Sequence, residues 1–168
     1  SDVYKRQDYG FEASWKAMED LYKDGRIKAI GVSNFQKHHL ERLFTYAQVI
    51  PAVNQIELHP KLTQKELRHF LEAHDIKVQA WSPLMQGQLL DNETIKTIAQ
   101  KHNKSTAQVI LRWHLEQGIL VNVKSVKTDR MRANRDIFDF SLDQDDMELL
   151  NNLDENLRVG PNPETFNF

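Results

Sequence analysis

Basic and hydroxyl side chains gather in one short stretch, residues 124–134, which reads Lys-Ser-Val-Lys-Thr-Asp-Arg-Met-Arg-Ala-Asn. The run before it is largely apolar and β-branched, as in a buried strand, and Thr128 could be the N-cap of a following helix. Lys124, Ser125 and Arg130, with the first free N–H groups of that helix, could then converge on one phosphate. The alternative is a solvated basic loop, and the spacing alone slightly favours it.

Other polar and aromatic side chains could do chemistry, but each also has a simpler explanation. Trp81 follows a predicted strand and could stack on a planar ring, although tryptophan is more often packed in a core. Gln55 could bind a carboxamide, although bonding to neighbouring backbone is the favoured reading. Glu57 and His59 could form an acid/base pair, although plain polar groups at a strand end explain them better.

The histidines do not form a metal-binding pattern in the sequence. Neither His38 with His39 nor His69 with His74 has a third ligand nearby on a common face. The chain also lacks a His-Glu-x-x-His motif and a glycine-rich phosphate loop of either nucleotide-binding type. We therefore predict no metal site.

The length, composition and net charge of the chain exclude several classes of function. The chain has 168 residues, of which 40% are hydrophobic, so it can bury a core. A net charge of −2 gives no electrostatic case for nucleic acid or an anionic membrane as a partner. The absence of cysteine excludes disulfides and thiol catalysis and agrees with a cytoplasmic location. No apolar run approaches the ~20 residues of a membrane span.

The first residues are expected not to belong to the fold. Residues 2–7 read Asp-Val-Tyr-Lys-Arg-Gln and resemble a translated sequencing adaptor. We expect residues 1–7 to be an assembly scar, with the natural sequence beginning near Asp8 inside a longer gene.

Apolar periodicity predicts alternating strands and helices. Strands are expected over residues 27–32, 52–58, 77–81 and 119–124, with amphipathic helices between and after them. Helices are expected to begin at the capping boxes Thr63 with Glu66 and Ser105 with Gln108, and at the N-cap Asp143. Helices are expected to end at Gly25 and Gly118. The acidic residues Asp145 and Asp146 then belong to a solvated first helical turn. The tail, residues 158–168, is expected to be a loop that docks elsewhere on the chain.

This alternation predicts the α/β class, with parallel strands and right-handed crossovers. Two architectures remain open: a small doubly wound sheet, or half of an eight-stranded barrel. In both, the polar residues at the carboxyl ends of the strands line one functional rim. Those residues are Ser33–Asn34, Gln55 to His59, Trp81–Ser82 and Lys124–Ser125.

Four separated motifs carry a family resemblance. They are Gly-Val-Ser-Asn-Phe at 31–35, Pro-Ala-Val-Asn-Gln-Ile-Glu at 51–57 with His59 and Pro60, Ser-Pro-Leu at 82–84, and Lys124–Ser125 with Arg130 and Asn134. In this order they resemble the aldo-keto reductases, over about residues 11–168. The chain is most similar to small bacterial members that reduce glyoxal, methylglyoxal or diketo-sugar acids.

The resemblance implies an eight-stranded (β/α) barrel that binds NADPH, of which residues 8–168 would hold strands five to eight. It implies an NADPH-dependent reductase of small carbonyl substrates, with a monomeric parent. The implied cofactor-binding residues are Ser33, Asn34, Gln55, Trp81, Ser82, Leu84, Gln86, Lys124, Ser125, Arg130 and Asn134. The family's catalytic Asp, Tyr, Lys and His lie on earlier strands, so this chain would contain no catalytic residue.

Two positions depart from the family pattern. Val123 stands where the family commonly has proline, and Ala133 where it commonly has the glutamate that contacts adenine. That adenine contact therefore has no counterpart here. Two rival functions remain: a self-contained, non-catalytic anion-binding α/β domain, and a structural fragment without a ligand.

Overall fold

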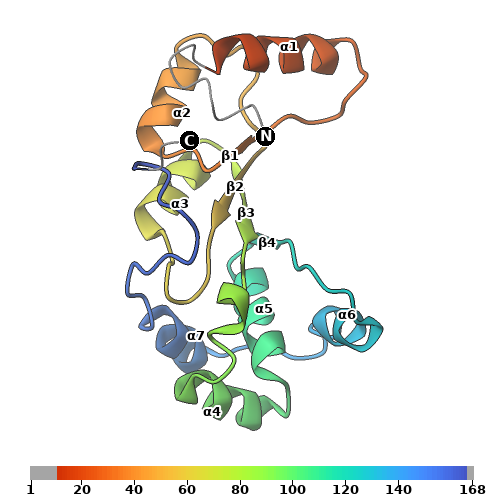
Figure 1. The fold of residues 1–168 in the computed structure, drawn as a ribbon, viewed down its shortest axis with the longest axis vertical. Helices are drawn as coiled ribbons and strands as arrows, with labels where there is room; N and C mark the ends of the chain where they lie inside the picture. Colours follow the sequence, from red (N-terminus) through yellow and green to blue (C-terminus); the bar gives the residue numbers. More distant parts are fainter. Residues whose placement is uncertain (1–10, 166–168) are drawn as a thin grey trace.

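Four parallel strands form the centre of the molecule. The computed structural model describes residues 11–165, so the adaptor-like segment lies outside the described residues. The strands are β1 (Val32–Ser33), β2 (Val53–Glu57), β3 (Lys77–Trp81) and β4 (Leu120–Val121), and they lie side by side in chain order (Figure 1). The α/β class with a parallel sheet is confirmed.

The two outer strands are shorter than predicted. Residues 27–31, 119 and 122–124 lie outside these two strands, β2 is one residue shorter than predicted at each end, and β3 has the predicted bounds. β1 and β4 each have a single neighbour in the described sheet, so fewer of their residues find a hydrogen-bonding partner. Gly31 allows the entry to β1 to approach β2 closely, because a Cβ there would lie 2.5 Å from Val53 Cγ1.

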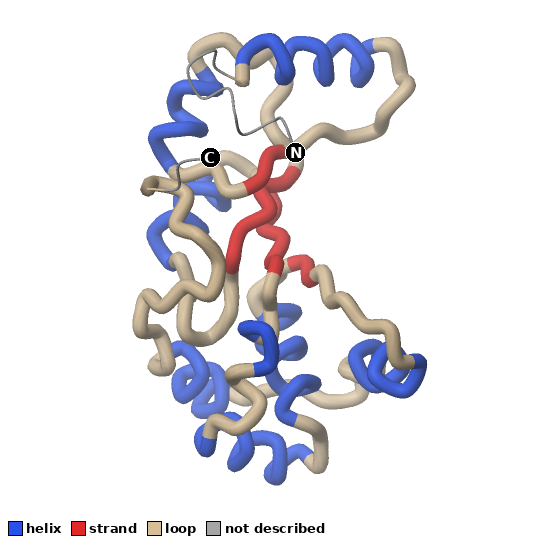
Figure 2. Tube along the Cα trace, viewed as in Figure 1, coloured by secondary structure: helices blue, strands red, loops and turns tan. Residues whose placement is uncertain are grey.

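Helices surround the strands on the outside (Figure 2). They are α1 (Glu12–Lys23), α2 (Lys37–Phe44), α3 (Lys65–Ala73), α4 (Glu93–His102), α5 (Thr106–Glu116), α6 (Thr128–Arg135) and α7 (Gln144–Asn151), with a short 3-10 turn η2 (Met85–Gly87). None of the described helices is long and apolar enough to cross a bilayer.

Several predicted helix ends are confirmed by their hydrogen bonds. The Ser105 hydroxyl oxygen accepts a hydrogen bond from the Gln108 N–H, and the Gln108 side-chain oxygen accepts one from the Ser105 N–H. The two bonds form the capping box of α5. Asp143 caps α7 in the same way. Gly25 and Gly118 follow helices with φ of 69° and 67°, the left-handed conformation that glycine adopts without strain.

Three local predictions are wrong, and for Thr63 and Asp146 the reason is that distant residues bind the same side chains. Thr63 does not cap α3, since its hydroxyl donates to the Asp154 carboxylate and Gln64 occupies the cap position. Thr128 is the first residue of α6 and not its N-cap. Asp146 is buried rather than solvated, because Lys101 donates to it at 2.9 Å and His102 lies 2.7 Å away.

The main apolar core lies between the sheet and helices α2, α3, α4, α5 and α7. It contains the buried side chains Leu40, Ile56, Leu58, Leu71, Ala80, Ile110 and Trp113. His114 is fully buried beside it, and burial lowers the pKa of His114 to about 4 despite carbonyl groups at both ring nitrogens. The strands therefore pack against a buried core, and this packing fixes the positions of the residues at their carboxyl ends.

Candidate functional site

Polar side chains from three neighbouring strands meet in one row. Ser33 lies opposite Gln55, and Gln55 lies opposite Gln79 in the parallel ladder. The Ser33 hydroxyl donates to the Gln55 carbonyl at 3.1 Å, and Gln55 Nε2 donates to Gln79 Oε1 at 2.8 Å. The expected backbone partner of the Gln55 side chain is thus replaced by another amide side chain. The row offers amide donors and acceptors near the rim.

The turn after β1 is held from two sides. Asn34 has a φ of 58°, and its N–H donates to the Gln55 carbonyl at 2.8 Å. The buried side chain of Asn54 accepts from the Phe35 N–H at 3.4 Å and donates to the Phe35 carbonyl at 2.8 Å. Asn54 is a positioning residue that the sequence analysis did not single out. The signal in the sequence was a polar amide side chain next to Val53 in a strand that is largely buried.

The Trp81 side chain is held at both ends of its ring system. Its indole N–H donates to Asn34 Oδ1 at 2.8 Å. At the opposite end, a Cβ added to Gly160 would lie 2.3 Å from Trp81 Cη2. Trp15 and Trp113 are buried in the cores, whereas Trp81 is only half-buried. Trp81 is therefore not part of the buried core, and as a residue it keeps some exposed surface.

The loop after β3 has an unusual backbone. Ser82 and Gln86 have φ values of 49° and 55°, although neither is glycine. Met85 between them also has a positive φ, and its N–H donates to the Ser82 carbonyl at 2.8 Å. Leu84 packs against the main core, while Gln86 is exposed. Left-handed conformations at non-glycine residues cost energy and gather at functional sites.

The basic residues singled out first lie apart from this row. Lys124 and Arg130 are exposed on the segment that leads from β4 into α6 (Figure 1). The Ser125 hydroxyl bonds only locally, accepting from the Lys127 N–H at 3.3 Å. Within residues 11–165, the side chains of Lys124, Arg130 and Asn134 form no hydrogen bond or ion pair with one another. The structure brings Ser33, Asn34, Gln55 and Trp81 together, and leaves the basic residues as a separate exposed group.

Glu57 and His59 are buried, so their interpretation as plain polar groups at the rim is wrong. Both side chains are 0% exposed, and His59 Nε2 lies 3.2 Å from Glu57 Oε1. The same carboxylate accepts from the Val159 N–H at 2.7 Å and from the Gly160 N–H at 3.3 Å. Burial alone would raise the pKa of Glu57, but these hydrogen bonds hold it below its ordinary value.

The tail docks on the rim, as predicted. Val159 and Gly160 of the tail bond to Glu57, and just before the tail the N–H groups of Glu155 and Leu157 both donate to the Lys61 carbonyl, at 3.2 and 3.0 Å. Docking brings together segments about a hundred residues apart in the chain. That distance explains why the sequence analysis could foresee docking but not the docking site.

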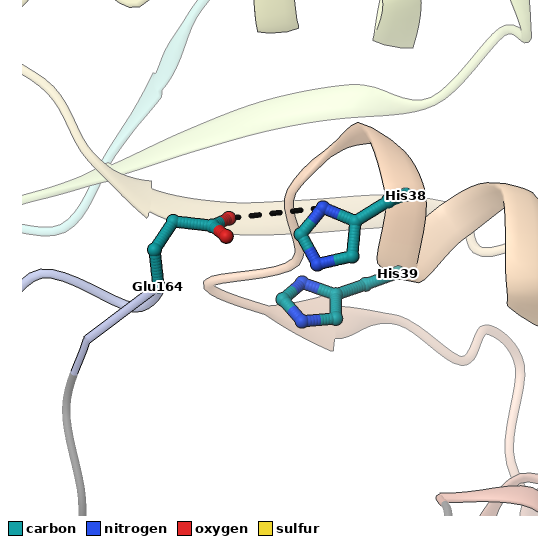
Figure 3. A group of neighbouring side chains, drawn as sticks. All are labelled: His38, His39 and Glu164. Atoms are coloured by element: carbon teal, nitrogen blue, oxygen red, sulfur yellow. Dashed lines mark ion pairs between the residues drawn. The ribbon is translucent and has the colours of Figure 1, made fainter.

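A histidine cluster gains a carboxylate that the sequence analysis did not foresee. Glu164, from the tail, lies 3.8 Å from His38, and His39 lies beside them (Figure 3). His39 Nδ1, however, accepts a hydrogen bond from the Gln36 N–H at 3.0 Å. A neutral imidazole that accepts at Nδ1 carries its proton on Nε2, so His39 has no free lone pair for a metal. We assign no metal to this cluster.

Comparison with known proteins shows which protein family the chain resembles. The model of the Aldo/keto reductase family matches residues 2–155. Glyoxal reductase of Bacillus subtilis (strain 168) is 57% identical over 158 residues, which are 94% of this chain and 57% of that protein. Methylglyoxal reductase DkgA of Escherichia coli (strain K12) is 45% identical over 155 residues, covering 91% of this chain and 56% of its own.

Solved structures agree with this match. The crystal structure of Gox0644 without ligand has a TM-score of 0.91 and 46% identity, covering 94% of this chain and 59% of its own. The structure of a Gox0644 variant in complex with NADPH has a TM-score of 0.89 and 48% identity, covering 92% of this chain and 57% of its own. The chain therefore spans little more than half the length of these relatives.

Proposed function

This chain belongs to the aldo/keto reductase family, and we propose that it is the cofactor-binding part of an NADPH-dependent reductase of small aldehydes or ketones. The observation that carries the proposal is the hydrogen-bonded row at the rim, with the half-buried Trp81 beside it. The names of its relatives support the reaction class, since two are reductases of glyoxal and methylglyoxal.

We further propose that the four strands are the fifth to eighth of an eight-stranded barrel. The outer edges of β1 and β4 have no neighbour among the described strands, and Leu120 on β4 is 50% exposed. A closed barrel leaves no free edges, so four further strands would pair with both. The greater length of the relatives supports the same arrangement.

Within that barrel, two groups of residues would hold the two ends of NADPH. At the nicotinamide end, Ser33, Asn34 and Gln55 offer donors and acceptors that match a carboxamide, and Trp81 offers a ring for stacking. At the other end, the exposed cations Lys124 and Arg130 suit the 2′-phosphate.

Neighbouring residues would complete the cofactor site. Ser125 would bind the 2′-phosphate together with the cations, and Asn134, on the same segment, would bind the adenosine. The strained loop with Ser82, Leu84 and Gln86 would follow the pyrophosphate between the two ends. Bound NADPH supplies the hydride, while the proton donor would come from a tyrosine of the missing strands.

A hybrid barrel tests this proposal. Residues 11–168 are joined behind the first part of Bacillus subtilis glyoxal reductase, the part that this chain does not match. We expect a folded monomer that binds NADPH and oxidises it in the presence of glyoxal. The first part alone is the control. A folded hybrid without affinity for NADPH would overturn the proposal, and phosphate binding by such a hybrid would favour the self-contained anion-binding domain.

A further inference from the structure

The buried carboxylate of Glu57 ties the end of the chain to the rim of the sheet. It accepts hydrogen bonds from the N–H groups of Val159 and Gly160, which lie more than a hundred residues further along. A buried carboxylate is stable only when its charge is compensated. The Arg158 guanidinium at 3.9 Å supplies an opposite charge, and His59 Nε2 lies within hydrogen-bonding distance of the carboxylate at 3.2 Å. The tail is therefore held by a charged anchor and not only by apolar packing.

The anchored tail segment lies against the proposed nicotinamide site. Glu57 and Trp81 are partners in the β2–β3 ladder, so they lie at the same level of the sheet. Gly160, held by Glu57, is so close to the indole that a Cβ would lie 2.3 Å from Trp81 Cη2. The other end of the indole donates to Asn34. A continuous series of contacts thus runs from Glu57 through the tail and Trp81 to Asn34.

We propose that Glu57 is a positioning residue for the cofactor site: its carboxylate fixes the tail, and the fixed tail holds the indole of Trp81 in its orientation. The role of the indole rests on the proposed function, whereas the anchoring of the tail does not. When the tail is released, the indole has support at only one end. NADPH must then order the ring on binding, and this ordering lowers the affinity.

Two substitutions in the hybrid barrel separate the steps of this inference. Glu57→Gln removes the charge, so the amides of Val159 and Gly160 should exchange with solvent roughly tenfold faster or more. The dissociation constant for NADPH should rise roughly threefold to tenfold, with kcat at saturating NADPH unchanged. Glu164→Gln, the same substitution at an exposed position of the same tail, is the control and should change neither quantity.

Gly160→Ala keeps the Glu57 carboxylate and adds one methyl group, which would lie 2.3 Å from the indole and 3.3 Å from Glu57 Oε2. It should also raise the dissociation constant for NADPH, but less so in a Trp81→Phe background, where the crowded ring atoms are absent. Unchanged amide exchange in Glu57→Gln would overturn the anchor. Unchanged NADPH affinity in both variants would overturn the positioning role. A wild-type hybrid that binds no NADPH would overturn the proposed function, while amide exchange would still decide whether Glu57 anchors the tail.

Discussion

Trp81 is the single residue on which the proposed nicotinamide site most depends. Its ring is half-buried and held at both ends, so little ordering is needed when a planar ring stacks on it. In the hybrid barrel, Trp81→Ala should weaken NADPH binding by ~1 kcal/mol or more, the scale of an aromatic pair. Binding is measured by calorimetry, with Trp81→Phe as the milder variant. Equal quenching of tryptophan fluorescence in wild type and Trp81→Phe would show that Trp15 or Trp113 reports the binding instead.

Arg130 should distinguish NADPH from NADH. Its guanidinium is exposed and free of ion pairs to other described residues, so it is available to the 2′-phosphate that only NADPH carries. Arg130→Ala should cost ~1.5 to 3 kcal/mol of NADPH affinity and little NADH affinity. Lys124→Met should act alike, and both effects should fade as salt rises.

Arg132→Ala is the matched control, because Arg132 is also exposed on α6 but has no proposed contact. Titration of both cofactors against the three variants decides the matter. An equal loss for NADPH and NADH in Arg130→Ala would mean that this residue does not bind the phosphate.

At the scale of elements, His114 connects α5 to the end of β2. Its Nδ1 lies 2.7 Å from the Ile110 carbonyl and its Nε2 lies 3.1 Å from the Leu58 carbonyl. Burial lowers its pKa from 6.5 to about 4, and the nearby His59 and Arg68 contribute in the same direction. Between these two pH values the unfolded chain binds a proton that the folded chain does not.

The free energy of unfolding should therefore fall as the pH falls from 6.5 towards 4, by at most about 3 kcal/mol from this group. Urea unfolding of the hybrid barrel at several pH values measures the decline. His114→Gln should give a shallower decline over that window, while the exposed His69→Gln serves as control. The same slope in wild type and His114→Gln would assign the pH dependence to other groups.

Sequence reasoning succeeded where local forces decide and failed where distant segments compete. The capping box of α5 and the bounds of β3 follow from neighbouring residues, and the structure confirms them. Thr63 carries the same cap signal, yet its hydroxyl pairs with Asp154, 91 residues away. Glu57 was likewise predicted to be an ordinary polar residue at the rim, but in the structure it is buried and bonded to the tail. The candidate cofactor residues were predicted from sequence motifs. Only the structure shows that Ser33, Gln55 and Trp81 belong to a hydrogen-bonded group, whereas Lys124 and Arg130 lie apart and exposed.

At the scale of the whole molecule, the sheet formed by the described residues has two open edges, and these should govern the behaviour of the isolated chain. The outer sides of β1 and β4 are unpaired in the described sheet, and Leu120 and Val126 are exposed beside β4. Such edges recruit other chains. We expect the isolated chain to dimerise or aggregate and to reduce no carbonyl, whereas the hybrid barrel should remain monomeric. Size-exclusion chromatography with light scattering compares the two. A monomer of the isolated chain with slowly exchanging β1 and β4 amides would contradict this expectation.

The strand order also determines how the sheet can form during synthesis on the ribosome. Every strand pairs with the one made just before it, so each new strand finds a finished edge as soon as it emerges. The tail is the exception, because Val159 and Gly160 are synthesised about a hundred residues after Glu57, the residue to which they bond. The Glu57 carboxylate therefore lacks these two partners until residues 159 and 160 have been made, so the anchor can form only after all four strands are available to pair.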